Sequence, residues 1–227
     1  MNGKLIVFEG GEGGGKTTQI KLLRDWLLAQ GQPNSHLSKS IDLEVIVTRE
    51  PGGTKLGKAL RELLLDPNMS GEKIQARAEL LLYAADRAQH IEALIKPYLQ
   101  KGAIVLCDRF TDSTIAYQGY GCGLNLELIK QLNHIATGGL KSDLTFWLDI
   151  EVESGLVRAK NRGKIDRMEQ ADIQFHQRVQ QGYQELAKSN PLLVRIDANL
   201  AIEKVQQQIQ EIFQQKLVEW EMNRAIE

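Results

Sequence analysis

Short apolar runs alternate along the chain with longer segments in which apolar residues recur at helical spacing. The apolar runs occupy residues 4–9, 44–48, 103–107, 144–148 and 192–196. Helical spacing extends over residues 17–30, 56–65, 75–98, 126–137, 152–159 and 173–188, and from 202 onward. Strands that alternate with helices predict an α/β fold in which a parallel five-stranded sheet carries helices on both faces. We see no internal repeat and no linker, so residues 1–227 are expected to form a single domain.

Three polar segments interrupt this pattern. Residues 32–42 contain a proline, an asparagine and three serines, and are expected to form a surface excursion. Residues 112–123 are polar and contain glycines, and we assign no regular element to them. Residues 160–167 form a dense basic run after a predicted helix. Together with the end of that helix, this run is either a solvated surface loop or a lid over a bound anion.

Composition, net charge and cysteine spacing exclude several classes of protein. The 227 residues are 42% hydrophobic and 25% charged, as in a globular protein with a real core. A formal net charge of −1 argues against a general nucleic-acid surface, which is normally strongly basic. Cys107 and Cys122 form neither a disulfide framework nor a metal-site spacing. The sequence shows no signal peptide and no apolar run of membrane-spanning length, so a reduced, cytoplasmic setting without a membrane partner is expected.

The first predicted strand runs into a glycine-rich turn that a predicted helix follows directly. The turn matches G-x-x-x-x-G-K-[ST], the pattern of a phosphate-binding loop (P-loop). Glycines let backbone N–H groups approach an anion, and the helix N-terminus adds its dipole. Lys16 supplies a mobile charge for the β and γ phosphates, whereas Glu12 cannot favour a phosphate and must face another group. The nucleotide-binding residues predicted from the loop are Gly10, Gly11, Glu12, Gly13, Gly14, Gly15, Lys16, Thr17 and Thr18.

In parallel sheets, ligands bind beyond the carboxyl ends of the strands. Asp108 ends an apolar strand and is expected to order Mg²⁺ together with the hydroxyl of Thr17, although a capping role is the alternative. Asp149 has the same strand-end position and is a rival, ranked lower because no arginine follows it. This rim therefore predicts Mg²⁺-dependent phosphoryl transfer.

Arginines are expected near the same rim. Arg49, Arg61 and Arg109 can grip an acceptor phosphate, because a guanidinium fork matches phosphate geometry. For Arg61 alone, a solvated ion pair on its helix is an equal alternative. If the segment 158–169 is a lid, its closure over ATP would exclude water and bring an arginine to the γ phosphate.

Tyr83 and Arg87 lie one turn apart on a predicted helix and therefore share one face. An aromatic ring beside a guanidinium suits a planar base with a carbonyl edge. The alternative is that Tyr83 belongs to the core while Arg87 is solvated.

These stretches resemble the bacterial thymidylate kinase family in order over most of the chain. The matching residues are Phe8-Glu9-Gly10 through Lys16-Thr17-Thr18, Thr48-Arg49-Glu50-Pro51-Gly52-Gly53, Tyr83-Ala84-Ala85-Asp86-Arg87, Asp108-Arg109-Phe110, Ala116-Tyr117-Gln118-Gly119 and Asp166-Arg167-Met168-Glu169. The resemblance implies a P-loop NTPase fold, transfer of the γ-phosphoryl group of ATP to dTMP to give dTDP, dependence on Mg²⁺, and a homodimer.

The resemblance also implies roles for individual residues. Tyr83 would stack on thymine, Arg87 would bind its carbonyl edge, and Tyr117 would crowd the ribose 2′ position. Thr114 and Gln118 would reach the polar edge of the base. Arg109 would bridge the donor and acceptor phosphates. Glu12 would lie near the acceptor sugar or its arginines, with Arg49 and Arg61 near the acceptor phosphate.

One branch of the family carries a catalytic arginine in the phosphate loop, but here Gly13 follows Glu12. The chain therefore resembles the branch that uses a lid arginine, for which we favour Arg162, with Arg158 and Arg167 as rivals. Arg158 is also expected to bind ATP. The segment 197–199 resembles the loop that borders adenine. Phe110 departs from the Tyr or His that is frequent in the family, and residues 32–42 are longer than usual.

Two other classes of function are the alternatives. A GTP-dependent switch would need a guanine-reading Asn-Lys-x-Asp stretch, and none is present. A kinase for another nucleoside monophosphate is a nearer rival, but Arg87 can only donate hydrogen bonds, whereas cytosine presents an amino donor at the same edge.

Overall fold

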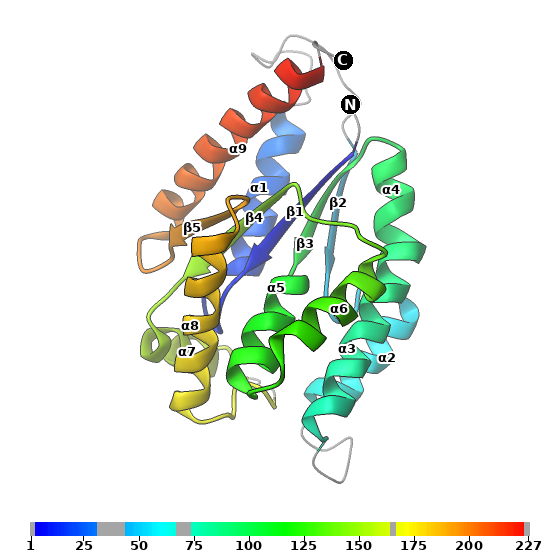
Figure 1. The fold of residues 1–227 in the computed structure, drawn as a ribbon. Helices are drawn as coiled ribbons and strands as arrows, with labels where there is room; N and C mark the ends of the chain where they lie inside the picture. Colours follow the sequence, from blue (N-terminus) through cyan, green and yellow to red (C-terminus); the bar gives the residue numbers. More distant parts are fainter. Residues whose placement is uncertain (1–2, 31–43, 67–73, 164–166, 225–227) are drawn as a thin grey trace.

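The computed structural model describes residues 3–30, 44–66, 74–163 and 167–224 of the chain. Within these ranges, parallel strands form a five-stranded sheet in the order β2-β3-β1-β4-β5 (Figure 1). The strands are β1 (Lys4–Glu9), β2 (Val45–Arg49), β3 (Ile104–Asp108), β4 (Leu144–Asp149) and β5 (Leu193–Asp197). Each strand coincides with a predicted apolar run to within one residue at either end, so the predicted α/β class is confirmed.

Helices connect the strands. They are α1 (Lys16–Gln30), α2 (Lys55–Leu65), α3 (Ala76–His90), α4 (Lys96–Gln100), α5 (Thr111–Thr114), α6 (Leu126–Thr137), α7 (Val152–Lys160), α8 (Ile173–Ser189) and α9 (Ile202–Arg224). Two π-helical segments continue α3 and α5, namely η1 (Ile91–Ile95) and η2 (Ile115–Gly121). Every segment predicted as a helix is helical within the described ranges.

The two π-helical segments are where the helices depart from the predictions. The segment predicted as one helix over residues 75–98 is continuous from α3 to α4, but η1 widens its middle. The segment 112–123, to which the sequence pattern assigned no regular element, is helical through α5 and η2. The prediction missed it because polar side chains there face the candidate site described below rather than solvent, which hides the usual amphipathic period. The predicted excursion at residues 32–42 lies outside the described residues, as do residues 164–166 of the basic run.

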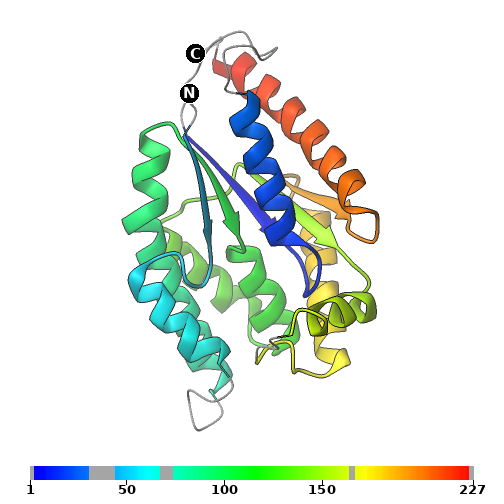
Figure 2. The same ribbon diagram turned by 180° about the vertical axis from the view of Figure 1, so that it is seen from behind.

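Helices cover both faces of the sheet. Successive side chains of a strand point to opposite faces, so Ile6 and Phe8 pack in one core cluster with residues of α1 and α9. Leu5 and Val7 lie in a second cluster, which includes η1 residues. A third cluster joins Trp147 of β4 to η2 and α8. Figure 1 shows α6 and α8 in front of the sheet, and Figure 2 shows α1 and α9 in front from the other side.

Strand register brings three strand ends together. Phe8 of β1 lies beside Asp108 of β3, and Arg49 of β2 lies on the other side of Asp108. The glycine-rich loop that follows β1 therefore meets the carboxyl ends of β2 and β3. Among the described helices, none has the length and apolar character needed to cross a bilayer.

Candidate functional site

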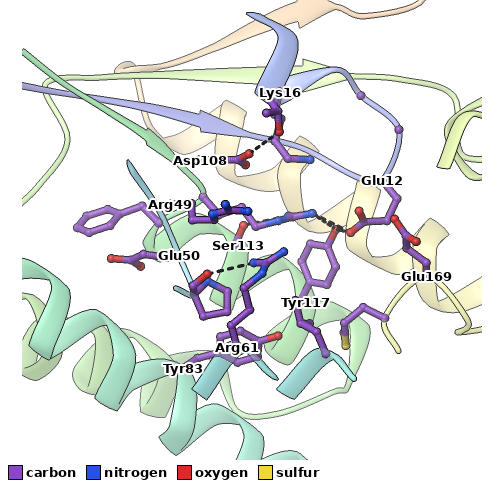
Figure 3. Close-up of a pocket in the computed structure, with 18 of the residues that line it drawn as sticks. Glu12, Lys16, Arg49, Glu50, Arg61, Tyr83, Asp108, Ser113, Tyr117 and Glu169 are labelled. Carbon is purple, nitrogen blue, oxygen red and sulfur yellow. Dashed lines mark hydrogen bonds and ion pairs between the residues drawn. The ribbon is translucent and has the colours of Figure 1, made fainter. Parts of the chain in front are cut away.

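A cavity of about 560 Å³ opens at the carboxyl ends of β1, β2 and β3. Figure 3 shows Lys16 and Asp108 at one end of it and Arg61 and Tyr83 at the other. Except for two loop glycines, Gly10 and Gly11, all the predicted site residues line this cavity. They are Glu12, Gly13, Gly14, Gly15, Lys16, Thr17, Thr18, Arg49, Arg61, Tyr83, Arg87, Asp108, Arg109, Thr114, Tyr117, Gln118, Arg158 and Arg162.

The glycine-rich loop has the geometry of an anion cradle. Gly13 has φ of +68°, a conformation that favours glycine, and a Cβ atom there would lie 2.1 Å from the carbonyl oxygen of Gly155 in α7. Lys16 Nζ donates to the carbonyl oxygens of Gly10 and Gly11, at 3.0 and 2.8 Å. Burial, together with the charge of nearby Arg109, lowers the pKa of Lys16. The ammonium group is thus held at the loop, beside the position that phosphates would take.

Two oxygen-bearing side chains meet next to Lys16. The Thr17 hydroxyl donates to Asp108 Oδ2 at 3.0 Å, and both residues line the cavity. Mg²⁺ prefers oxygen ligands and usually binds through one or two protein groups together with substrate phosphates and water. This pair fits that requirement. Asp149, the rival, instead accepts hydrogen bonds from Arg195 and Gln180, and does not line the cavity.

Arg109 lies at the centre of a partly buried cluster. Its Nη2 donates to Glu12 Oε1 at 2.7 Å and to the Tyr117 hydroxyl at 3.0 Å. The Tyr117 hydroxyl in turn donates to Glu12 Oε1 at 2.7 Å, and the Arg109 guanidinium lies 4.8 Å from the centre of the Tyr117 ring. Burial opposes ionisation of Glu12, but the charges of Arg109 and Lys16 outweigh it and lower the pKa of Glu12 to about 2. The acid in the anion loop therefore faces an arginine.

Glu9, which the sequence analysis quoted only as part of a motif, holds the backbone beyond β3. Its buried carboxylate accepts hydrogen bonds from the backbone N–H groups of Phe110 and Ser113, at 2.7 and 3.1 Å. The Tyr183 hydroxyl donates to it at 2.8 Å. Burial raises the pKa of Glu9, against the lowering effects of Ser113 and Arg109. A glutamate at the end of an otherwise apolar strand was the signal that such a role existed.

Arg87 is more enclosed than predicted. Its Nε donates to Glu50 Oε2 at 2.8 Å, and its Nη2 donates to the Phe110 carbonyl at 2.9 Å. Its Nη1 donates to Thr114 Oγ1 and Asn133 Oδ1, at 2.9 and 2.8 Å. Four of the five guanidinium N–H groups are thus engaged, which leaves one on Nη2. The alternative of a solvated Arg87 is wrong, because the residue is only 2% exposed.

Glu50 and His90 complete this network, and no role in holding Arg87 was predicted for either. His90 Nδ1 lies 2.9 Å from Glu50 Oε1, and His90 Nε2 lies 2.6 Å from Thr48 Oγ1. Both residues are buried. His90 holds the Glu50 carboxylate in place, and this carboxylate in turn orients Arg87. Their partners lie about 40 residues away in sequence, which is why the pattern alone did not reveal them.

The remaining arginines differ in where they are held. Arg61 Nη1 donates to the Pro51 carbonyl at 3.0 Å, and Arg158 Nη1 donates to the Ala198 carbonyl at 3.0 Å, in the segment expected beside adenine. Arg162 is paired with Glu169 at 2.6 Å while its side chain stays 59% exposed. Arg167 does not line the cavity, so the structure does not place this rival with the others.

Comparisons with known proteins agree with this geometry. The family model described as Thymidylate kinase matches residues 8–209. A protein named Thymidylate kinase from Trichodesmium erythraeum is 77% identical over 222 residues, which cover 97% of this chain and 99% of that protein. Another of that name from Nostoc punctiforme is 58% identical over 214 residues, 93% of this chain and 96% of the relative.

A solved structure gives the same result. The crystal structure of thymidylate kinase from Ehrlichia chaffeensis superposes with a TM-score of 0.73 at 32% identity. The match covers 94% of this chain and all of the other. Since sequence, fold and the cavity at the strand ends point the same way, this chain belongs to the thymidylate kinase family.

Proposed function

We propose that this chain transfers the γ-phosphoryl group of ATP to dTMP and releases dTDP and ADP. The observation that carries the proposal is that one cavity is lined by the phosphate loop, by the Arg109 cluster, and by the Tyr83 and Arg87 pair. Phosphoryl transfer requires a donor and an acceptor phosphate held in line with cations around the moving group. Residues 1–227 would act as one kinase domain, and a cytoplasmic location stays a prediction.

The loop end of the cavity would bind ATP. Backbone N–H groups of the loop would surround the phosphates, and Lys16 would exchange the carbonyls of Gly10 and Gly11 for phosphate oxygens. Thr17 and Asp108 would hold Mg²⁺, which when bound neutralises charge on the β and γ phosphates. Arg158, already bonded to the Ala198 carbonyl, would lie beside the adenine end of the nucleotide.

The opposite end of the cavity would bind dTMP. Tyr83 would stack on the base, and Arg87 would use its remaining N–H group on the C4 carbonyl. Thr114 and Gln118 would contact the polar edge of the base. Because the Tyr117 hydroxyl is held between Glu12 and Arg109, the ring has one fixed position near the sugar, where it would exclude a 2′-hydroxyl.

Arginines would then stabilise the transferring group. Arg109 lies between the two ends, bonded to the Gly10 carbonyl on one side and Tyr117 on the other. Arg49 and Arg61 would grip the acceptor phosphate. Arg162 would leave Glu169 and reach the γ phosphate, which is the role expected of a lid arginine where the phosphate loop has none.

We also propose a homodimer. Ile135 of α6 is 74% exposed and Leu81 of α3 is 59% exposed, although α3 and α6 pack against each other. Leu128, two turns before Ile135 on the same face of α6, is 49% exposed. Exposed apolar side chains on two neighbouring helices favour contact with a second copy of the chain.

The function is tested with the purified protein, ATP and Mg²⁺ against dTMP, dUMP, dCMP, dGMP, AMP and CMP. We expect turnover of dTMP with the highest kcat/KM, formation of dTDP and ADP in equal amounts, and loss of activity with EDTA. A preference for AMP or CMP would overturn the substrate, and GTP binding without turnover of any monophosphate would overturn the enzyme class.

A further inference from the structure

Gln118 contacts a carboxylate that no part of the proposed mechanism uses. Its Nε2 donates to Glu79 Oε1 at 2.8 Å, within a buried pair in which Gln118 is 2% and Glu79 3% exposed. Glu79 lies near the start of α3, one turn before Tyr83. It does not line the cavity, whereas Gln118 does. Glu79 therefore lies behind a residue that faces the acceptor base.

Glu79 is itself fixed from its other side. Its Oε2 is paired with Arg167 Nη2. Arg167 is anchored to the end of α2, because its Nε donates to the Leu64 carbonyl at 2.8 Å and its backbone N–H donates to the Leu65 carbonyl at 3.0 Å. A carboxylate that accepts from a guanidinium is ionised and can only accept hydrogen bonds.

This acceptor sets the direction of the Gln118 amide. An amide can turn over with little change of shape, which exchanges a donor NH₂ for an acceptor oxygen. Turned over, the Oε1 atom would face the Glu79 carboxylate, which places two acceptors in contact inside the protein. The pair therefore commits Nε2 to Glu79. Within the described part of the chain, Gln118 Oε1 has no hydrogen-bond partner, so the atom left for a ligand is an acceptor.

We propose that Glu79 is a positioning residue for base selection, because it makes Gln118 present an acceptor oxygen to the N3–H group of thymine. The proposal rests on the proposed function. Two side chains would then recognise thymine together. Arg87 offers a hydrogen-bond donor to the C4 carbonyl, and Gln118 offers an acceptor to N3–H. A base with a lone pair at N3 would meet the Gln118 oxygen with no proton between the two atoms.

The test needs an acceptor that differs from dTMP at N3 and keeps the C4 carbonyl and the methyl group. 5-Methyl-2′-deoxyisocytidine 5′-monophosphate has these properties, with a lone pair at N3 and an amino group at C2. The quantity measured is the ratio of kcat/KM for dTMP to kcat/KM for this analogue. Comparing that ratio between variants cancels the contribution of the C2 group. We expect the wild-type ratio to be on the order of 10³.

Glu79→Gln removes the acceptor-only partner, because the amide introduced at this position can donate or accept and thus permits either direction of Gln118. We expect the ratio to fall about tenfold or more, with KM for dTMP raised and KM for ATP nearly unchanged. The exchange Glu79→Gln with Gln118→Glu keeps the hydrogen bond with its donor and acceptor reversed and again leaves an acceptor for N3–H. We expect this double variant to recover the wild-type ratio to within about threefold.

A second variant covers the case in which Glu79→Gln does not fold. Glu79→Met with Arg167→Met replaces the ion pair by apolar side chains of similar length, a change that buried pairs often tolerate. In this variant the ratio of kcat/KM for dTMP to kcat/KM for the analogue should fall as it does in Glu79→Gln. If either folded variant slows both acceptors equally and leaves the ratio unchanged, Glu79 is only structural and the inference is wrong. Failure of the wild type to use dTMP would instead overturn the proposed function.

Discussion

Arg109 has a left-handed backbone, with φ of 72°, which costs free energy for a side chain of this kind. Its neighbours determine this conformation from several sides. The Arg109 N–H donates to the Phe8 carbonyl at 2.9 Å, and Glu9 accepts from the N–H of the next residue, Phe110. Held in this way, the guanidinium points back across the cavity to Glu12 rather than along the strand.

We expect Arg109→Ala to lower kcat about 10³-fold or more, which is the effect of removing an arginine that stabilises a transferring phosphoryl group. Steady-state assays with saturating ATP and dTMP measure it. Arg24→Ala, which removes an exposed arginine of α1 paired with Asp25, is the control and should be without effect. A near-normal kcat would remove Arg109 from the mechanism.

Asp86 of α3 is 1% exposed. Its Oδ1 accepts from the Gly52 N–H at 3.1 Å, and among the described residues Oδ2 has no hydrogen-bond partner. Burial and the nearby charge of Glu50 raise the pKa of Asp86 to about 6. Between the ordinary value of 3.8 and about 6, the folded chain therefore binds more protons than the unfolded chain, so stability falls as pH rises through this window.

Asp86→Asn should remove this loss and raise the free energy of unfolding at pH 8 by on the order of 2 kcal/mol. Urea unfolding at pH 4.5 and pH 8 measures it, with Asp25→Asn as the exposed control. Equal stability of Asp86→Asn and wild type at pH 8 would contradict the prediction.

Residues with a chemical signature could be predicted from the sequence, whereas the residues that hold them in place could not. Lys16, Asp108 and Arg109 follow from a loop pattern and a strand end. Glu50 and His90 were missed because their roles depend on partners brought close only by folding. Arg87 was expected to contact the base. It is enclosed because Glu50, Phe110, Thr114 and Asn133 surround its guanidinium.

Among the elements, α7 and the phosphate loop meet without side chains between them. A Cβ atom on Gly155 would lie 2.4 Å from the carbonyl oxygen of Glu12. This approach is shorter than real Cβ contacts, and the neighbouring atom is backbone, so one of the two segments would have to move. The position of α7, which carries Arg158, is thereby tied to the loop.

Gly155→Ala should displace the loop, raise KM for ATP and lower kcat by about tenfold, although alanine within a helix ordinarily stabilises by up to about 1 kcal/mol. Kinetics at varied ATP test this. Val157→Ala, at an exposed position of the same helix, is the matched control. Unchanged KM and kcat in Gly155→Ala would show that the contact has no bearing on ATP.

Strands were easier to predict than helices. Buried parallel strands read as continuous apolar runs, so each boundary fell within one residue. The π-helical geometry of η1 was not predicted, because one extra residue in a turn leaves the apolar positions nearly in place over five residues. The observed bounds of α6 agree in full with the predicted bounds, because both ends of this helix are capped. Asn125 accepts a hydrogen bond from the Leu128 N–H at the start, and Gly138 takes the left-handed conformation at the end.

For the whole molecule, we expect a homodimer through α3 and α6. Light scattering should give twice the chain mass of 25.5 kDa. Leu81→Glu with Ile135→Glu should give the mass of one chain, because burying two carboxylates at a contact is costly. Val218→Glu places one such carboxylate on an exposed position of α9, on the other side of the sheet, and should leave the dimer intact. A wild-type monomer at micromolar concentration would contradict the proposal.

The close approach of Gly13 to Gly155 also restricts which residues can occupy position 13. Any larger residue at position 13 would strike the Gly155 carbonyl and would need a backbone angle that only glycine adopts readily. An arginine there would therefore require the loop or α7 to move. A chain with an arginine at position 13 should therefore also differ in the course of its loop or in the placement of α7.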